Sequence, residues 1–207
     1  MDKSELEKGL DYIKTHDWKK QNTKDDKLTD FIYTAQTFDE VLQKAKENNA
    51  TEAYAVHRWY NFITSKNAEK IFCEYGAVKE EDEKNHNTDF WIKGTNFDLK
   101  MSVYPKALTK AGVNLDLTRR SGKNELAKWL CENASMQRRY HIGNRIFIVC
   151  DGKDDFDNYR LKNDTEQIRQ KVKRFMEYVD DKGFNQITYR DKNNQTRTIL
   201  TEVIMIQ

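Results

Sequence analysis

Hydrophobic residues recur at intervals of three and four along much of the chain, which is the spacing of amphipathic helices. This pattern predicts helices over residues 4–15, 38–48, 51–75, 121–139 and 165–179. Thr37 precedes the second of these as an N-cap, and Gly76 and Gly183 follow the third and the last as C-terminal stops. We expect the third helix to break near residues 64–67 and the polar residues 17–30 to form a loop.

Shorter apolar stretches between these helices predict strands. Residues 89–93 and 97–104 are expected to form a hairpin around a turn at 94–96, and residues 145–150 a central strand. Residues 187–190 and 196–206 predict a second hairpin near the C-terminus. Helices, a hairpin, a helix, a strand, a helix and further strands in this order indicate an α/β fold with a single central mixed sheet flanked by helices.

Composition narrows the class of protein. Charged residues make up 34% of the 207 positions, but 10 Phe, 10 Tyr and 4 Trp provide the large apolar surfaces that a core needs. No apolar run reaches the length of a membrane span, and residues 1–5 have no secretory pattern, so we expect a cytoplasmic protein with no membrane contact. Cys73, Cys131 and Cys150 are expected to be reduced core thiols.

Positive charge is concentrated in one segment. Residues 101–150 contain 9 Lys or Arg against 3 Asp or Glu, although the whole chain has a formal charge of only +2. Such an excess suits an anionic partner such as DNA, unless the counter-charges come from elsewhere in the fold. The expected phosphate contacts are Arg119, Arg120, Arg138 and Arg139, and salt bridges to the acidic residues 79–83 are the alternative role of the last two.

The first hairpin contains a candidate catalytic set. Asp98 and Lys100 are two residues apart, so a strand places them on one face. A turn of two or four residues would place Asp89 on that face as well, whereas a three-residue turn would place it on the other. Paired carboxylates are hard ligands that suit Mg²⁺, and a neighbouring ammonium can orient a water and stabilise charge on phosphate.

The residues Asp89 and Asp98-Leu99-Lys100, in a hairpin between two helices, resemble the PD-(D/E)XK nuclease superfamily over residues of about 52–150. The chain has Thr88 where the family often has Pro, and Asp98 where Glu is more frequent. The resemblance implies a restriction-endonuclease-like core that cleaves phosphodiesters, usually of DNA. Asp89 and Asp98 would bind Mg²⁺, or Mn²⁺ as a substitute, and Lys100 would assist the attacking water.

Many members of this superfamily also use a glutamate on the helix before the hairpin. Glu69 resembles that residue more closely than the alternative, Glu74. We therefore expect a nuclease-like domain over residues 51–207 and a helical extension over residues 1–50, which would cover a sheet edge, form a homodimer contact or reach DNA. The leading hypothesis is a metal-dependent DNA endonuclease of restriction, defence or repair, and the alternative is a non-catalytic nucleic-acid-binding or assembly protein that retains the fold.

Overall fold

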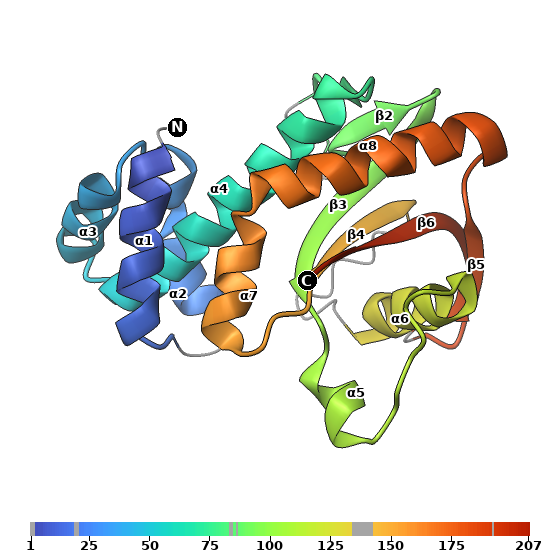
Figure 1. Ribbon diagram of the computed structural model, residues 1–207. Helices are drawn as coiled ribbons and strands as arrows, with labels where there is room; N and C mark the ends of the chain where they lie inside the picture. Colours follow the sequence, from blue (N-terminus) through green and yellow to red (C-terminus); the bar gives the residue numbers. More distant parts are fainter. Residues whose placement is uncertain (1–2, 19–20, 83–84, 86, 134–142, 192) are drawn as a thin grey trace. The chain divides into compact units, whose positions relative to one another are not determined.

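The computed structural model describes the chain except for residues 1–2, 19–20, 83–84, 86, 134–142 and 192 (Figure 1). The described residues form two units, one of residues 1–67 and 152–164 and the other of residues 68–151 and 165–207. This division differs from the expected one at residue 50. The long helix α4 (Glu52–Glu74) contributes its first part to one unit and its last turns to the other.

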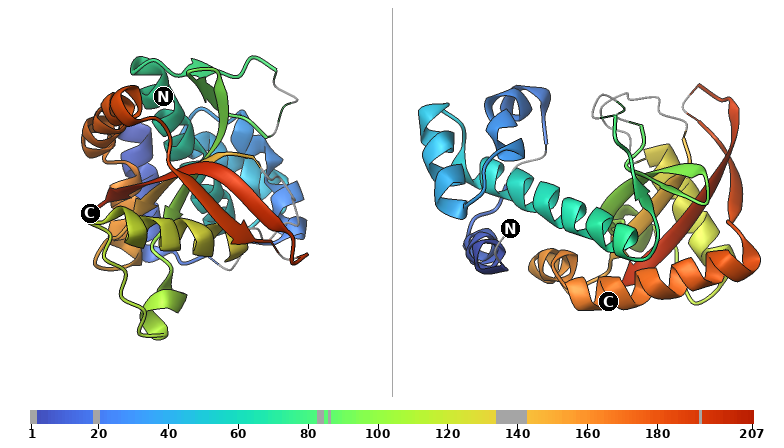
Figure 2. Two further views of the ribbon diagram at one scale, coloured as in Figure 1. Left: turned by 90° about the vertical axis from the view of Figure 1, so that its right-hand side faces the viewer. Right: turned by 90° about the horizontal axis from the view of Figure 1, so that it is seen from above.

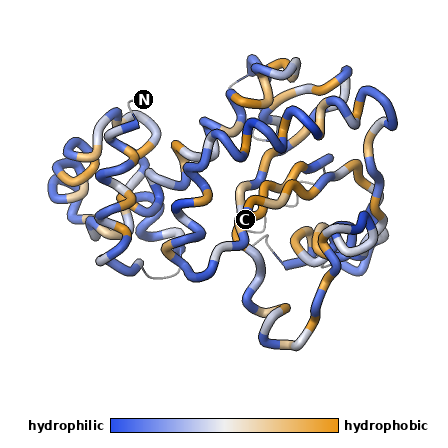
Figure 3. The backbone as a smooth tube through the Cα atoms, viewed as in Figure 1, coloured by the Kyte–Doolittle hydropathy of each residue, from blue (hydrophilic) through white to orange (hydrophobic). Residues whose placement is uncertain are grey.

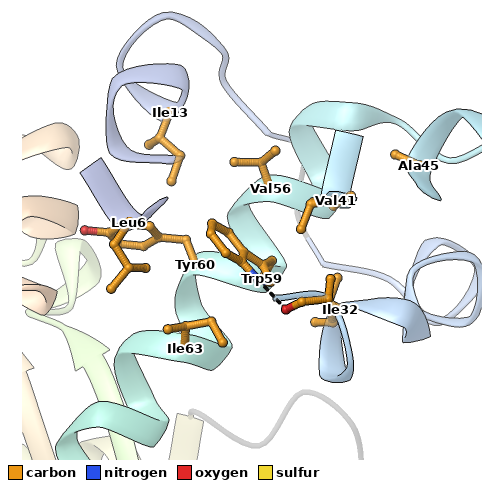
Figure 4. Packing of buried hydrophobic residues seen from close by; sticks show 11 residues of the cluster. Leu6, Ile13, Ile32, Val41, Ala45, Val56, Trp59, Tyr60 and Ile63 are labelled. Carbon is orange, nitrogen blue, oxygen red and sulfur yellow. Dashed lines mark hydrogen bonds between the residues drawn. The ribbon is translucent and has the colours of Figure 1, made fainter. Parts of the chain in front are cut away.

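The first unit is helical. Besides the first part of α4 it contains α1 (Lys3–Thr15), α2 (Thr23–Leu28), the 3₁₀ turn η1 (Asp30–Tyr33), α3 (Phe38–Glu47) and α7 (Asp155–Lys162). Its core surrounds Trp59 and Tyr60 of α4, which are fully buried among aliphatic side chains from α1, η1 and α3 (Figure 4). The Trp59 indole N–H donates to the carbonyl of Ala35 at 3.2 Å, so its one polar atom is satisfied inside the core.

The second unit contains a six-stranded mixed sheet in the order β1-β2-β3-β4-β6-β5. Its strands are β1 (Val78–Lys79), β2 (Phe90–Ile92), β3 (Thr95–Val103), β4 (Arg145–Cys150), β5 (Gln186–Arg190) and β6 (Thr196–Ile206). The strands β3, β4 and β6 are parallel, and the other pairs are antiparallel. The predicted α/β fold with one mixed sheet is therefore confirmed.

Helices cover both faces of this sheet, α6 (Arg120–Asn133) on one and α8 (Thr165–Lys182) on the other (Figures 1 and 2). Phe147 and Val203 point toward Leu126 and Leu130 of α6. The neighbouring positions along each strand point the other way, where Phe72 of α4 stacks on Phe90. The strands between these two layers consist mainly of hydrophobic residues (Figure 3). Every residue of β4 is buried.

The structure corrects several sequence-based expectations. The polar residues 17–30 contain α2, whose first turn is capped by the Asn22 side chain, and α4 continues through residues 64–67 without a break. Two short helices, α5 (Lys106–Lys110) and α7, were not predicted. The expected helix 121–139 ends at Asn133 within the described residues, and residues 134–139 lie outside them.

The structure also bears on the expected state of the cysteines and on membrane-spanning helices. Cys73, Cys131 and Cys150 are free, and the last two are buried, as predicted for core thiols. No helix in the described parts of the chain is long and apolar enough to cross a membrane.

Candidate active site

The turn between β2 and β3 determines which side chains share a face. It consists of Lys93 and Gly94 alone, with φ angles of 49° and 75°, as a tight two-residue turn requires. The last pair of the ladder is Phe90 with Phe97, and the Asp89 amide also donates to the carbonyl of Phe97, so Asp89 lies just beyond the paired residues. Of the turn lengths considered from the sequence, the structure has the two-residue turn, but the ladder does not continue to Asp89, so the turn alone does not fix the face of that carboxylate.

Asp98 is almost completely buried, with 6% of its surface exposed. Its Oδ1 accepts a hydrogen bond from Lys100 Nζ at 2.7 Å, and its Oδ2 lies 3.2 Å from Arg145 Nε. The two cations differ in exposure, because 51% of the Lys100 side chain is exposed but only 11% of the Arg145 side chain. Asp98 is therefore a buried carboxylate with one cation inside the protein and one that reaches solvent.

Arg145 was not predicted as part of this site. It is the first residue of β4 and is aligned with Asp98 of β3 and Thr201 of β6, so these side chains share one face of the sheet. A buried charge is costly unless it is paired. An arginine directly before the apolar residues 146–150 was the available signal, because such a side chain needs a carboxylate on the neighbouring strand.

Asp89 is bound to the backbone of β3. Its Oδ2 accepts a hydrogen bond from the Leu99 amide at 2.7 Å, while its own amide donates to the carbonyl of Phe97 at 2.9 Å. The β2–β3 ladder ends at Phe90, and the Asp89 carboxylate takes the place of the next strand residue as acceptor. This contact holds the Asp89 carboxylate at the residue that follows Asp98.

Asn144 connects the starts of the three parallel strands. Its carbonyl accepts from the Asp98 amide at 3.0 Å, and its side-chain Nδ2 donates to the carbonyl of Asn96 at 3.2 Å. Its Oδ1 accepts from the Leu200 amide at 2.9 Å. The backbone around Asp98 is therefore fixed by bonds to both neighbouring segments, which favours a preorganised carboxylate.

The two helix glutamates have other surroundings. Glu69 is buried on α4 near Cys73. The pKa of Cys73 is raised mainly because that thiol is itself partly buried, and secondly by the negative charge of Glu69. Glu74 forms an ion pair with Arg169 of α8 at 3.1 Å. Among the described residues, no three His, Cys, Asp or Glu side chains are grouped closely enough to hold a metal ion. The structure thus places Lys100 on Asp98 and the Asp89 carboxylate at the following residue, and the described residues do not group Glu69 with them as a third ligand. The catalytic roles of all four residues stay predictions.

The positively charged segment is partly neutralised from within the fold. Arg120 lies over the ring of Tyr178, with 4.9 Å between its guanidinium carbon and the ring centroid. Ion pairs join Arg119 to Asp116, Lys123 to Glu202 and Lys128 to Glu125. Arg138 and Arg139 lie outside the described residues. The alternative in which other parts of the fold supply counter-charges therefore applies to Lys123, and to Arg145 through Asp98, whereas Arg119 and Lys128 pair with acids of the same segment.

Comparisons with known proteins add no assignment, since no family model, curated protein sequence or solved structure matches the chain.

Proposed function

We propose that the chain is a divalent-metal-dependent nuclease that hydrolyses DNA phosphodiester bonds, with Asp89, Asp98 and Lys100 as its catalytic set. The observation that carries this proposal is the placement of Asp98. It is a buried carboxylate 2.7 Å from an ammonium that reaches solvent, and the Asp89 carboxylate is bound to the amide of the next residue, Leu99. A half-exposed ammonium on a buried carboxylate, with a second carboxylate bound at the adjoining residue, supplies the charges that phosphodiester hydrolysis needs.

The donor set suits a hard divalent cation. Mg²⁺ commonly takes one or two protein carboxylates and fills its other positions with water and substrate phosphate, so two aspartates suffice. Asp89 and Asp98 would hold the ion, which when bound would lower the pKa of a water and shield the charge of the phosphodiester. In the structure the Asp98 oxygens contact Lys100 and Arg145 instead, so the carboxylate charge is balanced by cations of the protein itself.

Lys100 and Arg145 would have different roles in this reaction. Lys100 is positioned by Asp98 and half exposed, so its ammonium can donate to a phosphate oxygen as negative charge builds there. Arg145 stays within the sheet and positions Asp98. Hydrolysis adds the oxygen of water to phosphorus and breaks a phosphorus–oxygen bond of the strand. The proton that the water loses is balanced by the one that the leaving alkoxide takes up.

The excess of Lys and Arg in residues 101–150 supports DNA as the partner. Of the arginines expected to contact phosphate, the structure describes Arg119 and Arg120, and both are exposed. Binding through phosphates should weaken with salt, with a log–log slope of about −0.9 per phosphate neutralised on duplex DNA. Replacing Arg138 and Arg139 together by Ala should flatten that slope. A cytoplasmic location belongs to the same proposal, because three free cysteines suit a reducing compartment.

One observation favours the alternative, a non-catalytic nucleic-acid-binding or assembly protein. Both carboxylates have partners in the protein without a metal. Asp89 accepts from the Leu99 amide, and Asp98 contacts Lys100 and Arg145. In that case the acidic pair would stabilise the hairpin, and DNA binding would need no divalent ion.

Nuclease assays with duplex, single-stranded and branched DNA, in Mg²⁺ and in Mn²⁺, test the proposal directly. Asp98→Asn should lower the cleavage rate by about 100- to 1000-fold, the usual cost of removing one electrostatic group from a reaction centre. The matched control is Asp180→Asn, which removes an exposed carboxylate that pairs with Lys93 at 2.8 Å. This control should cleave like the wild type.

Calorimetry with Mn²⁺ separates the two functions. The wild type and Lys100→Ala should bind the ion, because lysine is not a ligand, and Asp98→Asn should bind it weakly. Absence of binding by the wild type, or equal binding by wild type and Asp98→Asn, would reject the metal-dependent nuclease and leave the binding protein.

A further inference from the structure

A cavity of about 1200 Å³ lies in the second unit at the outer edge of β6. Because β5 pairs only with residues 196–200 of β6, the following residues 202–206 have β4 on one side and the cavity on the other. One wall is α8, and the opposite wall is formed by residues 112–118 and the first turn of α6. The volume exceeds the range of about 300–1000 Å³ that is typical of small-molecule sites.

This cavity is separate from the candidate active site. Tyr104, Asp151 and Gln207 line it, and each directly follows one of the parallel strands β3, β4 and β6. Asp98 and Arg145 lie in the first paired row of the same strands, at their opposite ends. The crevice outside the carboxyl ends of parallel strands is the usual ligand position in open α/β sheets.

Four cationic side chains face the cavity from two helices: Arg120 and Lys123 from α6, and Lys171 and Arg174 from α8. Lys171 and Arg174 are one helical turn apart, so they lie on the same side of α8. Within the described parts of the chain, no carboxylate lies within ion-pair distance of either of them. Two positive charges on this wall are therefore uncompensated.

The carboxylates of the lining already have partners. Glu202 accepts a hydrogen bond from the Val203 amide at 3.1 Å and lies 3.9 Å from Lys123. Asp151 accepts from the Gln207 side-chain amide at 3.2 Å. The remaining one, Asp116, pairs with an arginine outside the lining at 3.1 Å. The Gln207 amide is neutral, so Asp151 keeps its charge, but Arg120, Lys171 and Arg174 outnumber it, and the positive excess favours an anionic ligand.

Aromatic surface accompanies these cations. Tyr104, Phe175 and Tyr178 line the cavity, and Tyr178 is 37% exposed although its ring is large and apolar. The guanidinium of Arg120 lies over the Tyr178 ring and donates to its hydroxyl, so both side chains are held in place. Exposed Val113 adds apolar surface from the opposite wall. A ligand with both a charged group and a flat ring would use both kinds of surface.

We propose that this cavity binds a nucleotide, with its phosphates against Lys171, Arg174 and Arg120 and its base against the aromatic wall. The site requires neither Asp98 nor a metal there, so it stands or falls independently of the proposed catalysis, although Arg120 is also one of the proposed DNA contacts. Strand phosphates of DNA share the phosphate chemistry, but a free nucleotide matches a concave site better than a rigid duplex does.

Isothermal titration calorimetry with ATP on the full chain tests this inference, with adenosine and inorganic triphosphate as partial probes. The wild type and Asp98→Asn should bind ATP equally, and each partial probe should bind more weakly than ATP. The double variant Lys171→Ala/Arg174→Ala should weaken ATP binding by about tenfold or more, because two charge-assisted contacts are lost. Tyr178→Ala should weaken adenosine binding without removing that of triphosphate.

The matched control is Lys173→Ala/Lys182→Ala, which removes the same charge from exposed positions of α8 outside the cavity. It should bind ATP like the wild type. The inference is overturned if ATP fails to bind at millimolar concentration, or if the two double variants bind it equally. It is also overturned if Lys171→Ala/Arg174→Ala weakens binding of a DNA oligonucleotide but not of ATP, since the cavity would then be a strand contact.

Discussion

The ion pair between Asp98 and Arg145 should make a large contribution to the stability of the sheet. The two side chains are 9% and 11% exposed, and their charged atoms are 3.2 Å apart on adjacent parallel strands. Exposed pairs contribute at most about 1 kcal/mol, whereas removing one partner of a buried pair leaves an uncompensated charge and costs about 3–5 kcal/mol. The Asp98–Arg145 pair belongs to the second class.

The structure allows the cost of each change to be ordered. Arg145→Met leaves the buried Asp98 with Lys100 alone, and because Lys100 reaches solvent we expect a loss at the lower limit, about 3 kcal/mol. Asp98→Asn keeps one acceptor for Arg145 and should cost about 2 kcal/mol. The double variant has no unpaired charge at the site, so its loss should be smaller than the sum by about 2 kcal/mol.

Because the chain forms two units, the free energy should be read from the second unit alone. Hydrogen exchange of the β4 amides, followed by mass spectrometry, reports opening of the central strand. The matched control is Glu125→Gln with Lys128→Met, which removes a pair 2.9 Å apart on the exposed side of α6. Its coupling should stay below about 0.5 kcal/mol. An equally small coupling for Asp98 and Arg145 would refute the reasoning.

Three further changes test other parts of the fold. Gly122→Ala should destabilise the second unit by about 2 kcal/mol in urea unfolding, because the added Cβ would lie 2.2 Å from the carbonyl oxygen of Asp116. Burial lowers the pKa of His57 below its usual 6.5, so the unfolded chain binds more protons than the folded one. The free energy of unfolding should therefore fall as the pH drops below about 6.5, and His57→Gln should reduce that loss between pH 7.5 and 5.5. Burial raises the pKa of Cys131 to about 12, so iodoacetamide at pH 8 should label the less buried Cys73 before Cys131 in the native protein, and equal rates would contradict the fold.

Long segments with a regular hydrophobic period were predictable from the sequence, because the spacing of apolar residues along each segment is enough to indicate a helix or a strand. The 18 residues of α8 carry Ile168, Val172, Phe175 and Val179 on one side, and all four are buried. The short helices were not predictable in the same way. In α2, an N-cap by Asn22 and two acidic residues in the first turn stabilise six mostly polar residues, and no hydrophobic period marks them.

The candidate site was only partly predictable, because its contacts join strands far apart in the chain. Asp98 and Lys100 follow from the period of one strand. The position of Asp89 depended on a turn length that the sequence left open, and the positive φ of Lys93 shows why glycine preference alone did not reveal it. Arg145 enters through the parallel β3–β4 register, which neither strand determines by itself.

The contacts of Asp98 lead to a last prediction, which rests on the proposed nuclease. A divalent ion and Arg145 would compete for the same carboxylate, since Arg145 Nε lies 3.2 Å from Asp98 Oδ2. Arg145→Met should therefore bind Mn²⁺ more tightly than the wild type, by about tenfold, the equivalent of one lost charge-assisted contact. Arg145→Lys keeps the charge and should bind the ion nearly as the wild type does. Calorimetry at 15 °C keeps the destabilised variant folded during the measurement. Unchanged or weaker Mn²⁺ binding by Arg145→Met would show that Arg145 does not compete with the ion for Asp98, and would count against Asp98 as a metal ligand.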